Sequence, residues 1–312
     1  MNGTTESRGA PWHDERFKTR LPRPDVGASI KRNASDFVVR ERLCYAPAGL
    51  GEHVYLDLTK AHANTSWVAS QIAKYAEVRL QDVGYAGRKD RHAVTRQWFS
   101  VYLPRRNPEW SELKIKNVDL HQITRHRRKL RRGEIEANEF QLLIHFDSVV
   151  ERDGIEARLA QVRSLGFPNY FGSQRFGREL HNLERADRLL RAGLRQGGDR
   201  GMLISAARSW LFNCYLSGRL ALGKVSGAGP LYGKSRDPQA GESSLKPIYA
   251  AWVRGLRKLG VRVGERQLMA VPEALTWRFR KEALELQFEL ASGSYATSML
   301  SEIFIVRDEA RR

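Results

Sequence analysis

The chain has 312 residues, and 41% of them are hydrophobic, which is enough for a substantial core and excludes wholesale disorder. It carries 53 Lys and Arg residues against 35 Asp and Glu residues, so its formal net charge is +18. A surplus of this size predicts a polyanionic partner, nucleic acid before an acidic membrane surface. The two cysteines, Cys44 and Cys214, form no C-x-x-C motif, which argues against a zinc ribbon, an iron–sulfur centre and a disulfide scaffold.

The N-terminal segment, residues 1–24, is polar and lacks the apolar core of a secretory signal. It ends in the helix-breaking sequence Pro22-Arg23-Pro24, and we expect a disordered basic leader. No apolar run approaches the roughly 18–20 residues that a membrane-spanning helix needs. We therefore expect a cytoplasmic protein without membrane contact, in keeping with the few cysteines.

Beyond the leader, two kinds of periodicity alternate along the chain. Apolar and polar residues alternate, as in half-buried strands, at His53–Leu58, Gln97–Leu103, Glu139–Phe146, Leu275–Phe279 and Leu284–Leu290. Helical spacing predicts one helix that begins at Asn64 or Thr65. A second helix is expected to begin at Asp153 and to end at Gly166.

The middle of the chain has a different pattern, because from about Pro168 to Met269 the predicted elements are all helices. Their apolar stripes lie around Leu183–Leu190, Leu203–Cys214 and Pro247–Gly260. The order of strands, helices and strands predicts an α+β body interrupted by a mostly helical insertion. The expected boundaries are 25–167 and 271–312 for the body and 168–270 for the insertion.

Six of the eight residues in Arg125–Arg132 are Lys or Arg, the densest charge run in the chain. A solvated face is the alternative, but clustered like charges repel unless a counter-charge arrives. The run therefore predicts phosphate binding, which supplies affinity without base specificity.

Two glycine-containing stretches combine charge with other chemistry. In Gly84–Phe99, Asp90 is the only carboxylate and lies among cations, which lower the pKa of a carboxylate and keep it ionised, as a nucleophile or base requires. A structural ion pair in a turn fits the spacing alone better. In Pro168–Arg178, aromatic residues alternate with Arg, Gln and Gly, which suits base stacking and a domain hinge equally well.

The segment Ala228–Ser235 nearly matches the phosphate-loop pattern G-x-x-x-x-G-K-[ST], but its first position is Ala and Pro230 lies inside it. The expected flanks are a helix before it and the turn-like Ser235–Gly241 after it, so a turn is the better interpretation. There is no G-x-S-x-G or H-E-x-x-H motif, no histidine ligand spacing and no dinucleotide fingerprint. We expect no redox cofactor, metal ion or ATP.

Taken together, these stretches resemble the TruD family of tRNA pseudouridine synthases. Gly84–Phe99 resembles one family signature and Pro168–Gly177 a second. Further matches lie at Ser35–Val39, Arg125–Arg132, Ser205–Ser209 and Gly293–Ser298, so that the resemblance covers nearly the whole chain after about residue 25.

The resemblance implies an α+β pseudouridine-synthase domain with a mixed, largely antiparallel sheet, interrupted by a family-specific helical insertion domain. It implies isomerisation of uridine to pseudouridine at position 13, in the D-arm of tRNA. The partner would be tRNA, with no cofactor and no obligatory protein partner. Because a base within folded RNA cannot be reached, the nucleotide would be flipped out.

Residue by residue, the resemblance makes Asp90 the catalytic aspartate and Lys31 its ion-pair partner. Phe37 and Asn138 match positions that contact the substrate. Tyr295 stands where the family typically has a Phe that stacks on the flipped base, and whether its hydroxyl takes part is open. The cations expected to bind RNA are Lys89, Arg125, Arg127, Arg128, Lys129 and Arg175.

Several alternatives stay open at this stage. Asp90 could attack C1′, attack C6 or remove a 2′ proton, and the sequence does not decide among the three. Two other functions are a non-catalytic RNA-binding protein that retains the fold, and a nucleotide-dependent RNA enzyme that uses Ala228–Ser235. An intact Asp90 loop favours the isomerase, because a protein that only binds RNA has no need of a carboxylate in a phosphate-attracting pocket.

Overall fold

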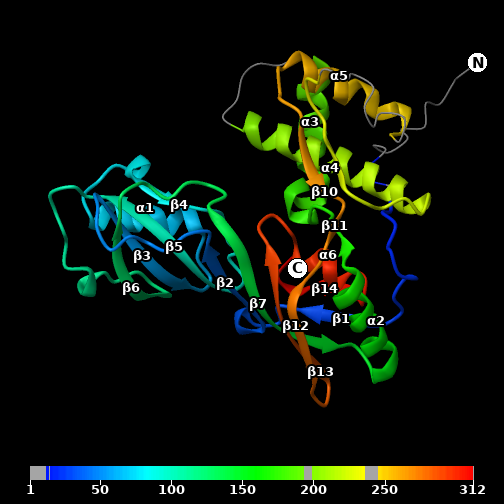
Figure 1. Ribbon diagram of the computed structural model, residues 1–312, viewed down its shortest axis with the longest axis horizontal. Helices are drawn as coiled ribbons and strands as arrows, with labels where there is room; N and C mark the ends of the chain where they lie inside the picture. The colour runs from blue at the N-terminus through cyan, green and yellow to red at the C-terminus, as the bar shows by residue number, and fades with distance from the viewer. Residues whose placement is uncertain (1–11, 14, 193–198, 236–244, 312) are drawn as a thin grey trace, which may run out of the picture. The chain divides into compact units, whose positions relative to one another are not determined.

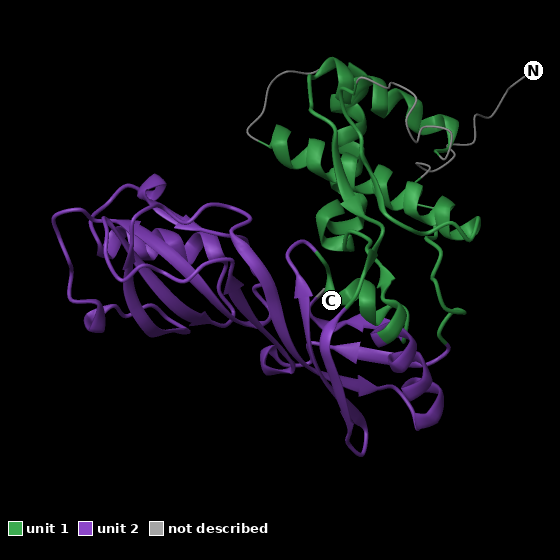
Figure 2. Cartoon of the chain, in the orientation of Figure 1, with its two compact units in different colours: residues 1–24, 164–271, 294–303 green, residues 25–163, 272–293, 304–312 purple. Residues whose placement is uncertain are grey.

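The structure is a computed structural model that describes residues 12–13, 15–192, 199–235 and 245–311. The chain divides into two compact units (Figure 2). Unit 1 comprises residues 1–24, 164–271 and 294–303, and unit 2 comprises residues 25–163, 272–293 and 304–312. Each unit therefore combines three segments that are distant in the sequence.

A mixed β-sheet is the framework of unit 2 (Figure 1). Its strands are β1 (Gly27–Ile30), β2 (Phe37–Leu43), β3 (His53–Lys60), β4 (Val83–Tyr85), β5 (Val94–Tyr102), β6 (Val118–His126), β7 (Ile135–Phe146), β12 (Glu273–Phe279), β13 (Ala283–Ala291) and β14 (Ile305–Asp308). The strand order is β12-β13-β7-β2-β5-β3-β6, with β1 beside β7 and β14, and β4 beside β5. Two pairs, β2–β5 and β1–β14, are parallel and the other pairs are antiparallel. The expected α+β fold with a largely antiparallel sheet is confirmed, as are all five strands predicted from alternation.

Two helices complete unit 2. Helix α1 (Thr65–Tyr75) packs Val68 and Ile72 against the inward side chains of β3 and β5. It starts where the sequence predicted, with Asn64 as its N-cap residue. Helix α2 (Arg152–Leu165) places the guanidinium groups of Arg152 and Arg163 over aromatic rings of β12. Short 3-10 turns lie at Ala34–Asp36, Leu80–Asp82, Trp110–Glu112 and Glu309–Arg311.

Unit 1 is built on three helices, α3 (His181–Ala192), α4 (Arg200–Ala221) and α5 (Ala250–Lys258). Their apolar stripes form one core, in which Trp210, Leu211 and Trp252 are buried. The unit also contains α6 (Ala296–Leu300) and the 3-10 turns Ser173–Phe176, Arg178–Leu180 and Pro247–Tyr249.

The sequence predicted only helices between Pro168 and Met269, and this was wrong in part. Two small antiparallel pairs lie there, β8 (Phe167–Pro168) with β11 (Met269–Ala270) and β9 (Ala228–Leu231) with β10 (Gly264–Gln267). These strands are two to four residues long and include Gly and Pro, so they are too short to show a period of two.

The near phosphate-loop segment begins as strand β9, which corrects the turn predicted for it. Its second glycine, Gly233, has a packing reason, because a Cβ there would lie 2.4 Å from the carbonyl oxygen of Val261. That contact accounts for the glycine without a phosphate. The turn expected over Ser235–Gly241 lies outside the described residues, apart from Ser235 itself.

The N-terminal segment is not a disordered leader throughout. Trp12 is only 5% exposed and its ring lies 5.5 Å from that of Trp252. The ring of Phe17 stacks on Tyr170 at 5.2 Å and meets Trp210 edge-on. The prediction is wrong for residues 12–13 and 15–24, because Trp12 is buried and Phe17 partly buried in unit 1. Residues 1–11 and 14 lie outside the described residues.

The compact units differ in their limits from the expected body and insertion. The chain enters unit 1 at residue 164 and leaves it after residue 271, against the expected 168 and 270. Unit 1 also includes residues up to 24 and the segment 294–303, neither of which was assigned to the insertion.

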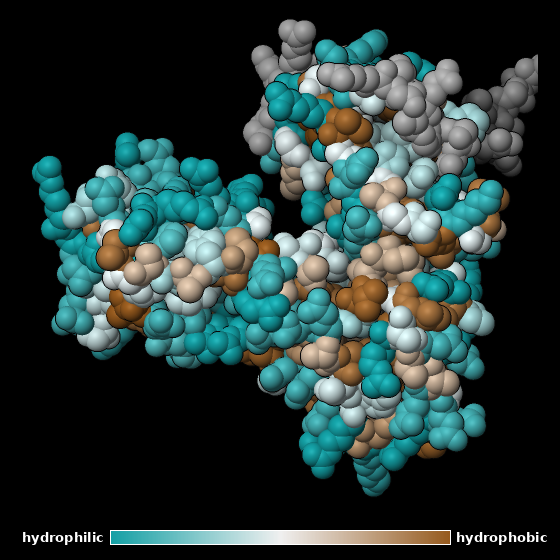
Figure 3. All heavy atoms as spheres, viewed as in Figure 1, coloured by the Kyte–Doolittle hydropathy of each residue, from teal (hydrophilic) through white to brown (hydrophobic). Residues whose placement is uncertain are grey.

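On the face in view, hydrophilic side chains cover much of the β3–β6 part of unit 2, as the charge of the chain leads one to expect (Figure 3). Among the residues that the structure describes, no helix has the length and apolar character needed to cross a membrane.

Candidate active site

Asp90 lies in the loop that joins β4 to β5, and hydrogen bonds from neighbouring elements hold the backbone of this loop. The Nζ of Lys60 donates to the carbonyl oxygen of Asp90 at 3.0 Å. The amide of Lys89 donates to Oγ1 of Thr65, the first residue of α1, at 3.0 Å, and Gln97 Nε2 donates to the carbonyl of Gly87 at 3.3 Å. The loop is thus fixed by the strand before α1, by α1 itself and by β5.

The carboxylate of Asp90 is paired with the ammonium group of Lys31, as the resemblance implied. Lys31 Nζ lies 2.5 Å from Asp90 Oδ2 and 3.1 Å from Asp308 Oδ2. The Lys31 side chain is 4% exposed, whereas that of Asp90 is 30% exposed. The other oxygen of Asp90 accepts a hydrogen bond from the backbone amide of His92 at 3.0 Å. The carboxylate is therefore held at both oxygens while one side of it faces solvent.

This environment lowers the pKa of Asp90. Burial acts in the opposite direction and is the largest effect, but the charge and hydrogen bond of Lys31, together with the His92 amide, outweigh it. Asp90 is consequently ionised at neutral pH without being solvated on all sides. A carboxylate in this state can act as a nucleophile or as a base.

Lys60 is a buried cation that the sequence analysis did not single out. It is 1% exposed, and its Nζ donates to the carbonyl oxygens of Asp90 at 3.0 Å and Ala63 at 2.9 Å. Burial lowers the pKa of Lys60 to about 8, although the charge of Asp90 opposes the shift. This side chain joins the end of β3, the strand before α1, to the loop that carries Asp90.

Asn138, on β7, belongs to a second buried cluster with Lys89 and Glu41. Lys89 Nζ lies 3.1 Å from Glu41 Oε2 and donates to Oδ1 of Asn138. Burial raises the pKa of Glu41, and the neighbouring Lys89 counteracts part of this rise. Because Lys89 can only donate, the amide oxygen of Asn138 faces it, which leaves the amide nitrogen as a donor for a substrate.

Lys89 was expected to bind RNA, and its placement does not fit that role. Its side chain is 9% exposed and is already engaged by Glu41 and Asn138. Its geometry is that of a positioning residue, which orients the amide of Asn138.

Phe37, expected to contact the target nucleotide, begins β2 and is 6% exposed. Lys31 Nζ lies over its ring at 4.7 Å, and Phe140 packs against the ring edge-on at 6.1 Å. The ring therefore lies behind the ammonium group of Lys31 and fixes its position, with little of its own surface open to a base.

Tyr295 and Arg175 belong to unit 1, where the second signature stretch surrounds Tyr295. Arg175 donates to the Tyr295 hydroxyl from Nη2 at 3.0 Å and from Nε at 3.3 Å. A Cβ at Gly172 would lie 3.0 Å from Cδ1 of Tyr295, so this glycine leaves space for the ring. The hydroxyl by which this chain departs from the usual Phe is thus held by an arginine.

The aromatic residues of that stretch mainly form the core of unit 1. Tyr170 and Phe176 are buried, whereas Phe171 lies under Arg266, whose guanidinium carbon is 4.1 Å from the ring centre. Burial lowers the pKa of Arg266 to about 10. These placements favour packing over base stacking for Tyr170 and Phe176.

The basic run, Arg125–Arg132, contains cations whose side chains already contact other groups of the protein and others whose side chains do not, among the described residues. Arg125 donates to the carbonyl oxygens of Gly51 at 3.0 Å and Leu103 at 3.2 Å. Arg128 pairs with Glu134 and Lys129 donates to a backbone carbonyl, so both are engaged within the protein. Arg127 is exposed and makes no ion pair or hydrogen bond among the described residues. Within this run, Arg127 is the predicted RNA contact that the structure leaves available.

Sequence reasoning missed Asp308, Glu41 and Lys60. Glu41 and Lys60 each continue a series of inward positions, after Phe37 and Val39 in one strand and after Leu56 and Leu58 in the other. A charged residue at an inward position of a strand can be recognised in the sequence, because a buried charge needs a partner. Asp308 gives no such signal, because only the pairing of β14 with β1 brings it to Lys31. The described residues contain no group of three or more His, Cys, Asp or Glu side chains that could hold a metal ion.

The site thus holds an ionised, partly exposed carboxylate beside a buried ammonium group. The amide nitrogen of Asn138, on the same sheet, makes no hydrogen bond within the part of the chain that is described. Comparison with known proteins identifies the class. The family profile described as tRNA pseudouridine synthase D (TruD) matches residues 19–194. A putative tRNA pseudouridine synthase D from Methanosarcina mazei has the same fold, with a TM-score of 0.67 over 95% of this chain and 97% of that one, at 15% identity. The chain is a pseudouridine synthase, an enzyme of the isomerase class.

Curated relatives narrow this class to one family. The tRNA pseudouridine synthase D of Cellvibrio japonicus is 39% identical, with 92% of each chain covered. That of Nitrosococcus oceani is 38% identical, with 90% of this chain and 91% of the relative covered. The chain belongs to the tRNA pseudouridine synthase D (TruD) family.

Proposed function

We propose that this enzyme isomerises uridine to pseudouridine at position 13, in the D-arm of tRNA, and that Asp90 is its catalytic residue. The observation that carries the proposal is the pair Lys31–Asp90, which keeps a carboxylate ionised and partly exposed within a chain of net charge +18. The net charge of the chain attracts a polyanion, and Asp90 is the single acidic side chain of the loop.

The reaction needs no net oxidation or hydrolysis. The bond between C1′ and N1 breaks, the uracil turns, and a bond between C1′ and C5 forms. The proton on C5 is then removed and N1 becomes protonated, so that the atoms of the nucleotide are conserved. Asp90 can serve by attack at C1′, by attack at C6 or by removal of the 2′ proton, and all three routes require the ionised carboxylate. Lys31 maintains that charge, and Lys60 and the His92 amide hold its position.

The target nucleotide would leave the RNA stack at a cost of a few kcal/mol. We propose that Tyr295 offsets this cost by stacking on the base, with Arg175 fixing the ring through its hydroxyl. The free amide nitrogen of Asn138 would donate to a uracil carbonyl. In this proposal unit 2 is the catalytic domain, unit 1 is the insertion domain, and the protein acts on tRNA in the cytoplasm.

The experiment uses two unmodified tRNA transcripts, one with uridine and one with cytidine at position 13. Pseudouridine is mapped by carbodiimide labelling and primer extension after incubation with the wild-type enzyme. We expect a single pseudouridine at position 13 of the first transcript and none in the second, with equal binding of both. Pseudouridine at another position of both transcripts would contradict the assigned site.

A further inference from the structure

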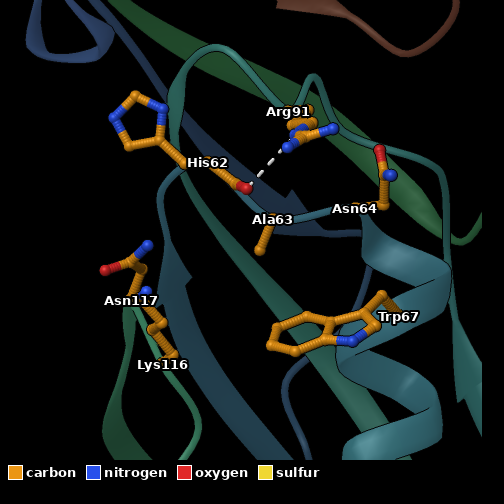
Figure 4. A pocket seen from close by; sticks show the side chains of 7 residues that line it. All are labelled: His62, Ala63, Asn64, Trp67, Arg91, Lys116 and Asn117. Atoms are coloured by element: carbon orange, nitrogen blue, oxygen red, sulfur yellow. Dashed lines mark hydrogen bonds between the residues drawn. The ribbon is translucent and has the colours of Figure 1, made fainter.

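A pocket of about 450 Å³ lies beside the catalytic loop, within unit 2 (Figure 4). We call it the Trp67 pocket, after the aromatic residue in its wall. His62, Ala63 and Trp67 come from the start of α1 and the turn before it, Arg91 comes from the catalytic loop, and Lys116 comes from the turn before β6. None of these side chains belongs to the site described above, to which the pocket is joined by the carbonyl oxygen of Ala63, an acceptor of Lys60.

Trp67 presents an unusual amount of aromatic surface. It is 41% exposed, and its ring makes no stacked or edge-on contact with another aromatic ring among the described residues. Figure 4 shows the indole beneath Ala63, with Lys116 on the opposite side of the opening. An exposed indole at the wall of a pocket is a platform on which a flat, π-bonded group can stack.

The pocket is also positively charged and has no acidic side chain in its lining. Arg91 donates from Nε to the carbonyl oxygen of His62 at 3.3 Å, which orients the guanidinium and leaves its two terminal nitrogens without a partner in the part of the chain that is described. Lys116 is exposed and makes no ion pair or hydrogen bond there either. Two cations without counter-charges, next to an aromatic platform, match the phosphate and the base of a nucleotide.

The pocket is tied to the catalytic loop by covalent and hydrogen-bonded links. Arg91 directly follows Asp90 in the sequence, and Lys60 holds the carbonyl oxygens of Ala63 and Asp90 with one ammonium group. His62 also lines a neighbouring pocket of about 640 Å³, to which Lys31 and His92, the two residues that hold the Asp90 carboxylate, contribute. A chain of nucleotides that reaches one pocket can therefore continue into the other.

From this arrangement we propose that the Trp67 pocket binds a second, unstacked nucleotide of the same RNA whose uridine reacts at Asp90. Its base stacks on the indole of Trp67, and Arg91 and Lys116 hold the phosphate. The proposal rests on the proposed function for the identity of the RNA. It adds a site that positions the RNA chain on unit 2 and contributes to affinity, not to the chemical step.

The first test compares Trp67→Leu with Tyr102→Leu, because Tyr102 is an equally exposed aromatic residue of unit 2 that is 40% exposed and lies outside the pocket. The dissociation constant for an unmodified tRNA transcript is measured by filter binding, and the rate by single-turnover formation of pseudouridine at saturating enzyme. Loss of one stacked base weakens binding about tenfold. We expect this loss for Trp67→Leu, an unchanged saturated rate, and partial recovery of affinity in Trp67→Phe. Tyr102→Leu should bind as the wild type does.

The second test replaces a charge in the pocket and a matched charge outside it. Lys116→Gln removes a pocket cation, and Lys114→Gln removes another exposed cation, two residues away, that does not line the pocket. Each phosphate contact to a single-stranded nucleic acid adds about 0.7 to the slope of log affinity against log salt. Lys116→Gln should lower this slope by about that amount, and Lys114→Gln should leave it unchanged.

The outcomes separate this proposal from the proposed function. If the wild type forms pseudouridine but Trp67→Leu binds as tightly as Tyr102→Leu, the pocket proposal is overturned and the enzymatic function stands. The same holds if Trp67→Leu lowers only the saturated rate. If the wild type forms no pseudouridine while Trp67→Leu still loses affinity for tRNA, the nucleotide site is supported and the proposed function fails.

Discussion

Asp90 is a carboxylate whose charge is maintained by a cation that solvent hardly reaches. Lys31 is 4% exposed, is bound by Asp90 and Asp308, and has the ring of Phe37 behind it. A buried ammonium group between two carboxylates cannot turn away to pair with RNA phosphate. The electrostatic support of Asp90 is therefore part of the folded protein before any substrate arrives.

Lys31→Met removes this support while keeping the length of the side chain. Burial then raises the pKa of Asp90 without the opposing effect of the Lys31 charge. The pKa of Asp90 should therefore rise above its ordinary value of 3.8. Activity requires the ionised form, and it should fall on the acidic side at a higher pH than in the wild type. We also expect the rate at neutral pH to fall about a hundredfold, because the carboxylate loses its position.

The measurement is the single-turnover rate against pH for both proteins at saturating enzyme. Lys74→Met, which replaces an exposed lysine of α1, is the matched control and should keep the wild-type profile. If Lys31→Met kept the wild-type profile as well, Lys31 would not be the group that sets the charge of Asp90.

The polar members of the site illustrate how far the sequence can predict single residues. The spacing of the Asp90 loop alone favoured a structural ion pair, and the resemblance implied both the pairing of Asp90 with Lys31 and the candidate roles of Asp90 and Asn138. Glu41 and Lys60 follow from strand periodicity once each strand is extended by one inward position, because a buried charge needs a partner. Asp308 could not be predicted, since its role depends on a parallel pairing between two strands far apart in the chain.

At the level of elements, the site depends on close contact between β4 and the basic run. Gly84 is where the two meet, since a Cβ there would lie 2.4 Å from the carbonyl oxygen of Leu130 and 2.6 Å from Oγ of Ser100. The amide of Leu130 donates to that same Oγ at 3.0 Å. The strand that leads into the catalytic loop and the stretch that carries the arginines are therefore packed backbone to backbone.

Gly84→Ala should separate these elements. The added methyl group meets a backbone carbonyl that cannot yield as a flexible side chain would, and overpacking of this kind costs about 1–3 kcal/mol. Gly87→Ala is the matched control within the same motif, because a Cβ at Gly87 has nothing within 4 Å. Urea unfolding followed by circular dichroism should show a lower midpoint for Gly84→Ala than for Gly87→Ala; equal midpoints would mean that the contact is not tight.

Over the whole molecule, composition predicted the class of partner but not the cations that serve it. A net charge of +18 indicates a polyanion, yet Arg125 and Lys89 are engaged inside the protein. Lys116, which the sequence did not single out, makes no ion pair or hydrogen bond among the described residues. Tertiary contacts determine which cations are engaged and which are available, and these contacts cannot be predicted from the local density of charge in the sequence.

Tertiary contacts also decide which segments join unit 1. The polar N-terminal segment gave no sign of its docking, which depends on Glu302 accepting from the amides of Arg20 at 3.0 Å and Leu21 at 2.9 Å. Ser298, close to Tyr295 in the chain, donates to the carbonyl oxygen of Tyr170 at 3.0 Å. Period and composition describe elements one at a time, so they predicted the main helices and five of the strands but not these attachments.

The central claim is that one carboxylate isomerises a uridine in tRNA. The most direct measurement is the amount of pseudouridine formed in an unmodified tRNA transcript by the wild type and by Asp90→Asn, with binding of the same transcript measured alongside. We predict a full site in the wild type, none in Asp90→Asn, and dissociation constants that agree within about threefold, because Asp90 contacts the reacting atoms and adds no attraction for phosphate. Pseudouridine formed by Asp90→Asn, or none formed by the wild type although it binds the transcript, would contradict the account.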